Sequence, residues 1–429
     1  MKRVAFVVAI TFACTTIVYG QSGLVVDRIE IEGLWRTRPI VVLRELLFEP
    51  EDVLRDETIA ESATRLRNLQ LFSEVDIDVT EVEDRRALVT IRVVEKWTII
   101  PIFKAGGGGG INFLTIGAFD VNTFGRYLEL GGQYERLGRT NSGVLWFRDP
   151  RFLGRRLRVG GDFWSLARNR RLYDQDAELT GGYTHSRLRA HLFFDRELHS
   201  HLTAGGGIDL TSDSYSREDL ERDARDRSIA NGLPLPNSES HISPYVTLHL
   251  GRLNFDNYLV AGNLTEVRLA YGIALDNNSE HHVMGELSQR LFFLLPRFWG
   301  NIGVQGVLGQ STSDSPAFQY YIGGLDAVRG YFDGQFLSPA FWRLNLEYRV
   351  ASIQTEWFVL QHVFFSDIGN IGDDLYLAVT SDERPFVGYG LGIRLISPRV
   401  HRFNVRFDYA LVTGRDGPGG ISFGFQHFF

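Results

Sequence analysis

The residues with the most obvious chemical potential are histidines beside a serine, at His199, Ser200 and His201. A serine nucleophile needs an imidazole base within hydrogen-bond reach. His199 and Ser200 are adjacent in a stretch that alternates like a β-strand, so we expect their side chains on opposite faces. The same argument removes His281 and His282 as a chelating pair. A lipid hydrolase is therefore the disfavoured hypothesis, and we expect neither a catalytic residue nor a metal site.

A second candidate for chemistry is the glycine run from Gly106 to Gly110. A phosphate-binding loop would continue with Lys and Ser or Thr at the start of a helix. The residues that follow are Ile111-Asn112-Phe113, which supply neither. Two interpretations stay open: a flexible turn, or glycines that end a β-strand and weaken its pairing. No cofactor is predicted.

The third candidate is an arginine between two glycine clusters, in residues 320–334. At its centre stand Val328, Arg329, Gly330 and Tyr331. Glycines let the backbone fold tightly, so that one cation can be held in a fixed place. An arginine enclosed by protein needs carboxylate partners, because removing one partner of a buried pair costs about 3–5 kcal/mol. The alternative is an ordinary surface loop with a solvated arginine.

Acidic partners for Arg329 stand in the next two predicted strands, at Glu347 and Asp367. Polar residues share the parity of Glu347 along 343–349, which turns Glu347 inward. Asp367 shares its parity with polar Gln361 and also with apolar Val363, so its direction stays open from the pattern alone.

The elements that must position these residues are β-strands, because apolar residues take every second position in long stretches after residue 97. A soluble sandwich would also alternate, with its polar face outside. Here the alternation is rich in aromatics and continues to the last residue, which is typical of a transmembrane β-barrel. The apolar positions include Val267, Leu269, Tyr271, Ile273 and Leu275; Val387, Tyr389, Leu391 and Ile393; Phe403, Val405, Phe407 and Tyr409; and Ile421, Phe423, Phe425 and Phe429.

Length and charge limit the remaining possibilities. Roughly 330 residues are left for the barrel, enough for about 14 to 16 strands at roughly 10 residues each plus turns. The formal net charge of −7 argues against a nucleic-acid partner. A charged loop at about 212–240 is predicted to be solvated and to carry no chemistry, with a short surface helix around 217–223.

The N-terminus predicts export followed by a small domain. Residues 1–20 have the charged start, apolar core and small-residue end of a signal peptide. They contain Cys14, the only cysteine. A lipoprotein signal at Cys14 is the weaker alternative. Residues 24–96 predict an α+β domain in the order β-α-α-β-β, with a helix at 39–47 and another at 56–71.

The stretch GG-LDA-VRGY at 323–331, with FSDIGN at 365–370, resembles the BamA/TamA-type family of outer-membrane assembly and translocation proteins. The resemblance implies a periplasmic POTRA domain at 24–96 and a 16-stranded antiparallel barrel of the bacterial surface antigen type at 97–429. It also implies that the VRGY tip of an extracellular loop folds back into the lumen. Glu347 and Asp367 match the acidic partners of the loop arginine in that family.

The function implied by the resemblance is the insertion or translocation of polypeptide clients at the bacterial outer membrane. The implied partners are unfolded outer-membrane or secreted polypeptides, outer-membrane lipids and accessory lipoproteins. Larger relatives carry several POTRA domains, whereas this chain has room for one, which favours a specialised relative. The alternative is a passive porin-like or adhesin-like barrel, which would lack both the POTRA unit and the VRGY loop.

The closure of the barrel is the last predicted feature. Closure must pair a first strand at about 98–107 with a last strand at about 420–428. Glycines add no cross-strand packing, and such side-chain pairs contribute about 0.2–1 kcal/mol each. We therefore expect a weak lateral seam. Its expected residues are Gly106, Gly107 and Gly108 on one side and Phe423, Phe425 and Phe429 on the other.

Overall fold

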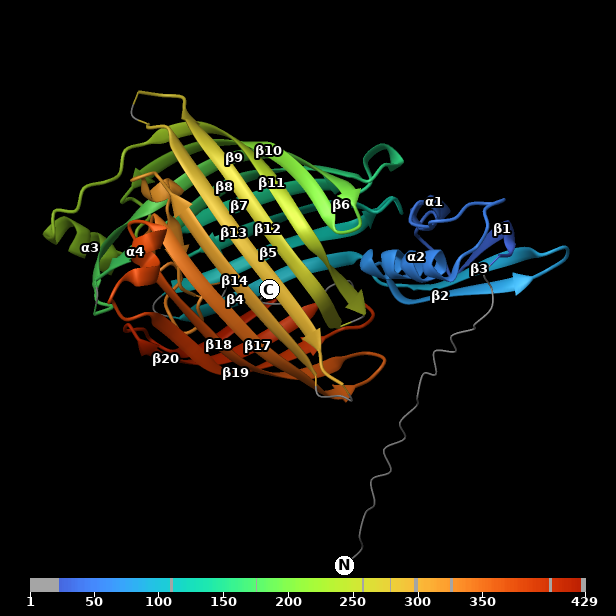
Figure 1. Cartoon of the computed structure of the whole chain (residues 1–429). Helices are drawn as coiled ribbons and strands as arrows, with labels where there is room; N and C mark the ends of the chain where they lie inside the picture. Colours follow the sequence, from blue (N-terminus) through green and yellow to red (C-terminus); the bar gives the residue numbers. More distant parts are fainter. Residues whose placement is uncertain are drawn as a thin grey trace, which may run out of the picture.

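The computed structural model shows a small N-terminal domain attached to one end of a large β-barrel (Figure 1). The predicted signal peptide at 1–20 lies outside the described residues, as do Phe429 and residues 325–326 of the loop motif. The structure describes residues 23–108, 111–174, 176–256, 258–277, 279–296, 300–324, 327–400 and 403–425.

The N-terminal domain has a three-stranded sheet in the order β1-β3-β2, covered by two helices. β1 (Val25–Glu32) runs parallel to β3 (Arg86–Glu95), and β2 (Phe72–Glu81) runs antiparallel to β3. The helices are α1 (Pro39–Leu43) and α2 (Asp56–Asn68), so the predicted order β-α-α-β-β is confirmed. Both are shorter than expected.

The core of this domain lies between the helices and the sheet. Side chains from both helices and from the central strand are fully buried there, as the 3.6-residue and two-residue periods of the sequence predict. Its buried members include Val26, Val41, Val42, Leu54, Leu66, Val89 and Ile91.

The barrel is a single 16-stranded sheet in which chain neighbours pair, apart from two short strands left out of it. The predicted 16-stranded antiparallel barrel is confirmed. Its strands are β4 (Ile99–Gly108), β5 (Ile111–Thr123), β6 (Leu128–Leu137), β7 (Thr140–Asp149), β8 (Leu157–Tyr173), β9 (Leu179–His199), β10 (Leu202–Ser216), β11 (Glu239–Asp256), β12 (Leu259–Ala274), β13 (His282–Leu294), β14 (Asn301–Ser311), β17 (Ala340–Gln354), β18 (Val359–Gly372), β19 (Phe386–Ile396), β20 (Asn404–Gly414) and β21 (Gly420–Phe425).

The barrel is polar inside and apolar outside. Along β17, Asn345 and Glu347 are fully buried, whereas Leu344 and Leu346 are more than 40% exposed on the outer wall. A soluble sandwich would show the opposite. None of the helices in the described part of the chain is long and apolar enough to cross a membrane.

The longest inward excursion of the chain is the loop between β14 and β17, residues 312–339, which we call the lumen loop. It contains the 3-10 turn η2 (Pro316–Phe318) and the short hairpin of β15 (Tyr320–Ile322) and β16 (Phe336–Ser338). Two other loops at the same end of the barrel contain helices, α3 (Arg222–Ala230) and α4 (Leu375–Thr380). The charged loop predicted at 212–240 thus does contain a helix, slightly later in the chain than expected.

The N-terminal domain is clamped to the turns at the near end of the barrel. Arg151, in the turn between β7 and β8, donates two hydrogen bonds to Glu45, at 2.6 and 2.7 Å. Glu45 is only 1% exposed. Arg252 of β11 donates to Glu61 of α2 at 2.7 Å. This hydrogen bond lowers the pKa of Glu61, so the contact is present at neutral pH and weakens as pH falls through that lowered pKa.

We predict that Arg151→Ala loosens the clamp far more than Arg252→Ala. The first variant strands a buried carboxylate, which costs about 3–5 kcal/mol. The second breaks a partly exposed pair, with a cost of about 0–1 kcal/mol. Hydrogen exchange at the amide of Arg38, which donates to the carbonyl of Gly125 in the turn after β5, measures the opening of the interface. If the Arg38 amide exchanged at the same rate in both variants, Arg151 would not be the more important contact of the interface.

Candidate functional site

The site is built around Arg329, whose side chain is 0% exposed inside the barrel. Its Nε and Nη2 donate to the two carboxylate oxygens of Asp367, at 2.7 and 2.8 Å. Its Nη1 donates to Glu347 Oε1 at 2.6 Å, and its backbone N–H donates to Asp367 Oδ2 at 3.1 Å. The structure therefore brings all three of these sequence-predicted residues together, and Asp367, whose direction the pattern left open, points inward.

Further buried charges surround this triad. Glu347 also accepts from Arg349 and Arg394, at 2.7 and 3.2 Å. Arg394 donates in turn to Asp408 at 2.6 Å. Such a network is stable only if its members satisfy one another, because lone buried charges are strongly unfavourable. The roles of Arg394 and Asp408 were missed from the sequence, although both directly follow an apolar position of the alternating pattern, Ile393 and Phe407.

An aromatic ring completes the pocket for the guanidinium. The Arg329 Cζ lies 3.6 Å from the centre of the Phe365 ring. A planar cation over an aromatic face is attracted by the ring's electron density. Phe365 and Asp367 have the same parity on β18, so one strand supplies both the ring and the bidentate carboxylate.

The close approach of the loop to the wall depends on glycine. A Cβ at Gly388 of β19 would lie 2.0 Å from the carbonyl oxygen of Arg329, which no side chain could tolerate. Gly330 has a φ of +95°, and a Cβ there would lie 2.6 Å from Val412 Cγ1. Only glycine combines that backbone conformation with so little space. The glycines of the motif and of β19 are thus both needed to seat Arg329.

The neighbours of Arg329 in the motif hold the loop against β19 and β20. The Tyr331 hydroxyl donates to the carbonyl of Thr413 at 3.0 Å and accepts from the backbone N–H of Val387 at 3.0 Å. Val328 is fully buried in an apolar cluster with Phe341 and Phe386. This end of the lumen loop is fixed by polar and apolar contacts together.

The other end of the lumen loop reaches the opposite wall. The ring of Phe318 lies 4.6 Å from that of His241 and 4.0 Å from that of His282. Arg187 of β9 donates to the carbonyl of Ala317 at 2.7 Å. Phe332, next to the VRGY motif, stacks on Tyr173 of β8 at 4.9 Å. The loop therefore crosses the lumen and contacts both sides of the barrel.

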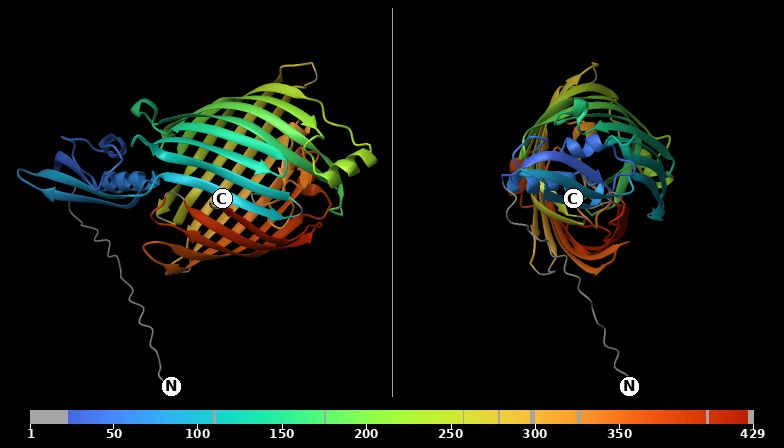
Figure 2. Two further views of the ribbon diagram at one scale, coloured as in Figure 1. Left: turned by 180° about the vertical axis from the view of Figure 1, so that it is seen from behind. Right: turned by 90° about the vertical axis from the view of Figure 1, so that its right-hand side faces the viewer.

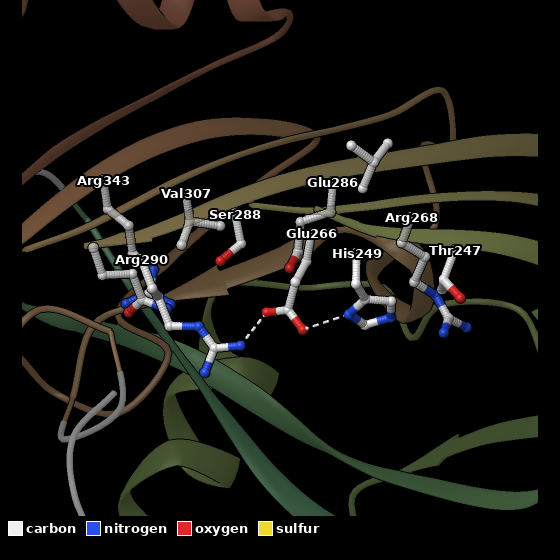
Figure 3. Close-up of a pocket in the computed structure, with 11 residues that line it drawn as sticks. Thr247, His249, Glu266, Arg268, Glu286, Ser288, Arg290, Val307 and Arg343 are labelled. Atoms are coloured by element: carbon white, nitrogen blue, oxygen red, sulfur yellow. Dashed lines mark hydrogen bonds and ion pairs between the residues drawn. The ribbon is translucent and has the colours of Figure 1, made fainter. Parts of the chain in front are cut away.

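A polar cavity of about 380 Å³ lies inside the barrel along β11 to β17. Figure 3 shows Glu266 between His249 and Arg290, with Glu286 and Arg343 also lining the space. His249 Nδ1 lies 3.0 Å from Glu266 Oε1, and Arg290 forms an ion pair with the same carboxylate. The lumen thus contains a cavity lined by charged side chains beside the loop.

The expectation for Ser200 is wrong in its geometry. Ser200 Oγ lies 2.9 Å from His201 Nδ1 and 3.2 Å from His199 Nδ1. β9 ends at His199 and β10 begins at Leu202, so residues 200–201 form a turn and strand alternation does not apply. The group lies on an exposed turn, where water weakens the electrostatic stabilisation on which a hydrolase depends.

The predicted seam strands are the two ends of the sheet, and the sheet curls round to bring them near each other (Figure 2). β4, which includes Gly106, Gly107 and Gly108, pairs with β5. β21 pairs with β20, where Phe423 packs on Phe407 at 4.7 Å and Phe425 is opposite Val405. Between residues 99–108 and 420–425, the described parts of these two strands, no ladder is formed.

One contact crosses the seam at the end nearest the N-terminal domain. The backbone N–H of Trp97, two residues before β4, donates to the carbonyl of Arg399 at 3.0 Å, and Trp97 and Val400 form a parallel bridge. Arg399 belongs to the turn between β19 and β20. Its guanidinium lies 3.9 Å from the Trp357 ring and pairs with Glu356 at 3.0 Å.

The family model described as "Omp85 superfamily domain" matches residues 122–429. The chain belongs to the Omp85 superfamily. A second model, for the POTRA domain and described as "Surface antigen variable number repeat", matches residues 24–96. The predicted resemblance is thereby confirmed, and Omp85 membership makes this an outer-membrane barrel with its POTRA domain in the periplasm. It is a non-enzymatic family.

The curated relatives of this Omp85 chain are assembly factors. It is 26% identical to "Outer membrane protein assembly factor BamA" of Nitratidesulfovibrio vulgaris over 450 residues, covering 97% of this chain and 52% of that protein. It is 25% identical to the BamA of Neorickettsia risticii over 145 residues, covering 34% of this chain and 20% of that protein. The chain therefore spans about half the length of the first relative.

Solved structures show the same fold at low identity. BamA from Haemophilus ducreyi lacking POTRA domains 1–3 has a TM-score of 0.55 at 15% identity, covering 94% of this chain and 84% of that chain. CdiB from Escherichia coli has a TM-score of 0.66 at 14% identity, covering 94% and 75%. CdiB from Acinetobacter baumannii has a TM-score of 0.58 at 15% identity, covering 94% and 73%.

We predict that Arg329→Ala destabilises the folded barrel by about 3–5 kcal/mol, because it leaves Glu347 and Asp367 buried with one cation fewer. Arg329→Lys should restore little, since an ammonium cannot make the bidentate contact. Arg290→Ala is the matched control: its pair with Glu266 is 25–30% exposed, and its cost should be about 0–1 kcal/mol. The temperature at which each barrel loses its folded gel mobility measures the difference. Similar values for Arg329→Ala and Arg290→Ala would refute the anchor.

Proposed function

We propose that this Omp85 chain inserts or translocates polypeptide clients at the outer membrane, with the seam between β4 and β21 as its working edge. The observation that carries the proposal is the lack of a ladder between the described parts of β4 and β21 in a sheet whose other neighbours all pair. Lipid cannot provide hydrogen bonds to the edge of a sheet, whereas an incoming strand can. The seam is therefore a template for a client strand.

The residues of the seam fit this role. Gly106, Gly107 and Gly108 stand near the end of β4 furthest from the periplasm, where they offer no side chains to pack against a partner. On the other side, Phe423 and Phe425 belong to a strand of only 6 described residues. Phe429, which lies outside the described residues, belongs to the seam that the sequence predicts. A glycine-rich edge offers few side-chain contacts across the seam, so the two strands can separate at low cost.

The POTRA domain supplies a second edge for polypeptides. β1 and β2 are the outer strands of its sheet, and the start of β1 is already bonded to residues 51–54. An outer strand such as β2 can accept an extended chain through backbone hydrogen bonds with little sequence preference. β3 continues through residues 96–98 into β4, so a client bound beside the POTRA sheet is close to the seam. Accessory lipoproteins are further candidate partners, in keeping with the assembly-factor relatives.

The proposed role of Arg329 and its partners is to keep the lumen loop in place. Val328, Arg329, Gly330 and Tyr331 hold the lumen loop against β19 and β20, the strands next to β21. Glu347 and Asp367 keep the loop in place while the seam is disturbed. This fixed wall lets the seam open without loss of the whole barrel.

A passive porin-like or adhesin-like barrel is the second candidate, and the polar cavity along β11 to β17 is the observation that favours it. Against it stands the lumen loop, which crosses the barrel from Arg187 to Asp367. A porin should show a steady and large conductance in a planar bilayer. A barrel obstructed by the loop should show low conductance that rises in Arg329→Ala.

We predict that a disulfide across the seam stops client handling and that reductant restores it. One cysteine is placed between Ile99 and Phe103 and the other between Ser422 and Phe425, and facing pairs are found by oxidation. The matched control is a disulfide between Tyr409 and Ile421, paired neighbours on β20 and β21. It should leave client handling unchanged, because these strands are already joined. A seam-locked barrel that still folds its clients would remove the gate and leave a lumen route or a passive pore.

A further inference from the structure

A short helix lies against the outer wall of the barrel at the end furthest from the POTRA domain. This helix, α4, belongs to the loop between β18 and β19, residues 373–385 (Figure 1). Trp342 of β17 donates its indole N–H to the carbonyl of Ala378 at 2.8 Å. Asp374 caps the helix by accepting from the backbone N–H of Leu377 at 2.7 Å. The helix is thus capped by its own residue Asp374 and held against the barrel by Trp342 of β17.

The strand residues that hold α4 point outward. Trp342 has the parity of Leu344, and Gln310 has the parity of Leu308, and both leucines are exposed on the outer wall. The Gln310 side-chain oxygen accepts from the backbone N–H of Leu375 at 3.4 Å. A polar amide on the outer wall would be costly against lipid. α4 lies over this amide and donates one backbone hydrogen bond to its oxygen.

The outer face of α4 is apolar and uncovered. Ala378 is completely buried against the barrel, whereas Tyr376 is 73% exposed and Val379 is 66% exposed. Leu377 is 43% exposed between them. The helix therefore buries its small residue and presents its large apolar residues away from the protein, which is the reverse of a helix that faces water.

Tyrosines stand on the outer wall towards the same end of the barrel as α4. Tyr134, Tyr271 and Tyr389 are 43–47% exposed on the outer wall, each near the extracellular end of its strand. Outer-membrane barrels place aromatic girdles where lipid acyl chains meet the headgroups. Trp342 lies near the extracellular end of β17 and holds α4 at this end of the barrel. Tyr376 therefore continues the girdle over a sector where the strands themselves offer Gln310.

We infer that α4 is an interfacial helix that inserts Tyr376, Leu377 and Val379 into the outer leaflet, at the boundary between acyl chains and headgroups. The occupant of its apolar face is lipid, because that face is continuous with the lipid-facing wall formed by Leu308 and Leu344. Acidic residues flank the helix at 373–374 and 382–383, where they remain in the headgroup layer. This inference does not depend on client handling.

Site-specific fluorescence tests the inference in the full chain. The only cysteine is replaced by Cys14→Ser, and an environment-sensitive dye is attached at Tyr376→Cys. The folded barrel is placed in vesicles of phosphatidylethanolamine and phosphatidylglycerol, and folding is checked by gel mobility before heating. The matched control carries the dye at Asp382→Cys, an exposed position in the same loop beyond the helix.

The dye at 376 should show blue-shifted emission, strong quenching by lipids with a nitroxide near the top of the acyl chain, and weak quenching by aqueous iodide. The dye at 382 should show the opposite. Trp342→Phe, which removes the indole donor but keeps an aromatic ring, should shift the emission at 376 towards that of water. Equal iodide quenching at 376 and 382 would overturn the inference. A blue-shifted dye at 376 that neither quencher reaches would also overturn it, because the apolar face would then be covered by protein.

Discussion

Arg329 carries a full positive charge inside the barrel, where Glu347 and Asp367 balance it in place of water. This interaction determines much of what surrounds it. The loop that delivers the guanidinium must pass close to β19, and that proximity requires glycine at 388. Because Glu347 also binds Arg349 and Arg394, the charge is shared across β17, β18 and β19. Strands that could otherwise shift in register are held together from the inside.

Much of this architecture could be predicted from the sequence, because its signals are local. Alternation identified the strands and placed Glu347 on the inner face, and the glycine-rich VRGY motif indicated a tight loop with a fixed cation. The pairing of Arg394 with Asp408 could not be predicted, since it depends on the register between β19 and β20. The local rule also failed at Ser200, because alternation says nothing about where a strand ends. α4 was missed because its 6 residues are too few for a periodic signal.

Polar groups on the barrel wall need partners from the protein, because lipid cannot provide hydrogen bonds. The inner and outer faces of the wall obtain these partners in different ways. Inward-facing charges are paired by the lumen loop and by neighbouring strands. Outward, the Gln310 amide is covered by α4. β4 and β21 differ from the other neighbours in the sheet, because no ladder joins the described parts of these two strands. That contrast is the physical reason for assigning the activity to the seam rather than to another part of the wall.

The attachment of the POTRA domain decides which side of the proposed seam moves. β4 is continuous with β3 through residues 96–98, and the domain that contains β3 is clamped to the barrel at Arg151 and Arg252. Displacing β4 would therefore strain this linker or break the buried contact of Glu45. β21 pairs with β20, and Gly419, directly before β21, donates its backbone N–H to the carbonyl of Gly330 in the anchored lumen loop at 2.9 Å, so β21 is held at its extracellular end. In the proposed mechanism β4 is the fixed template and β21 yields from its periplasmic end, after the bridge between Trp97, before β4, and Val400, in the turn between β19 and β20, has opened.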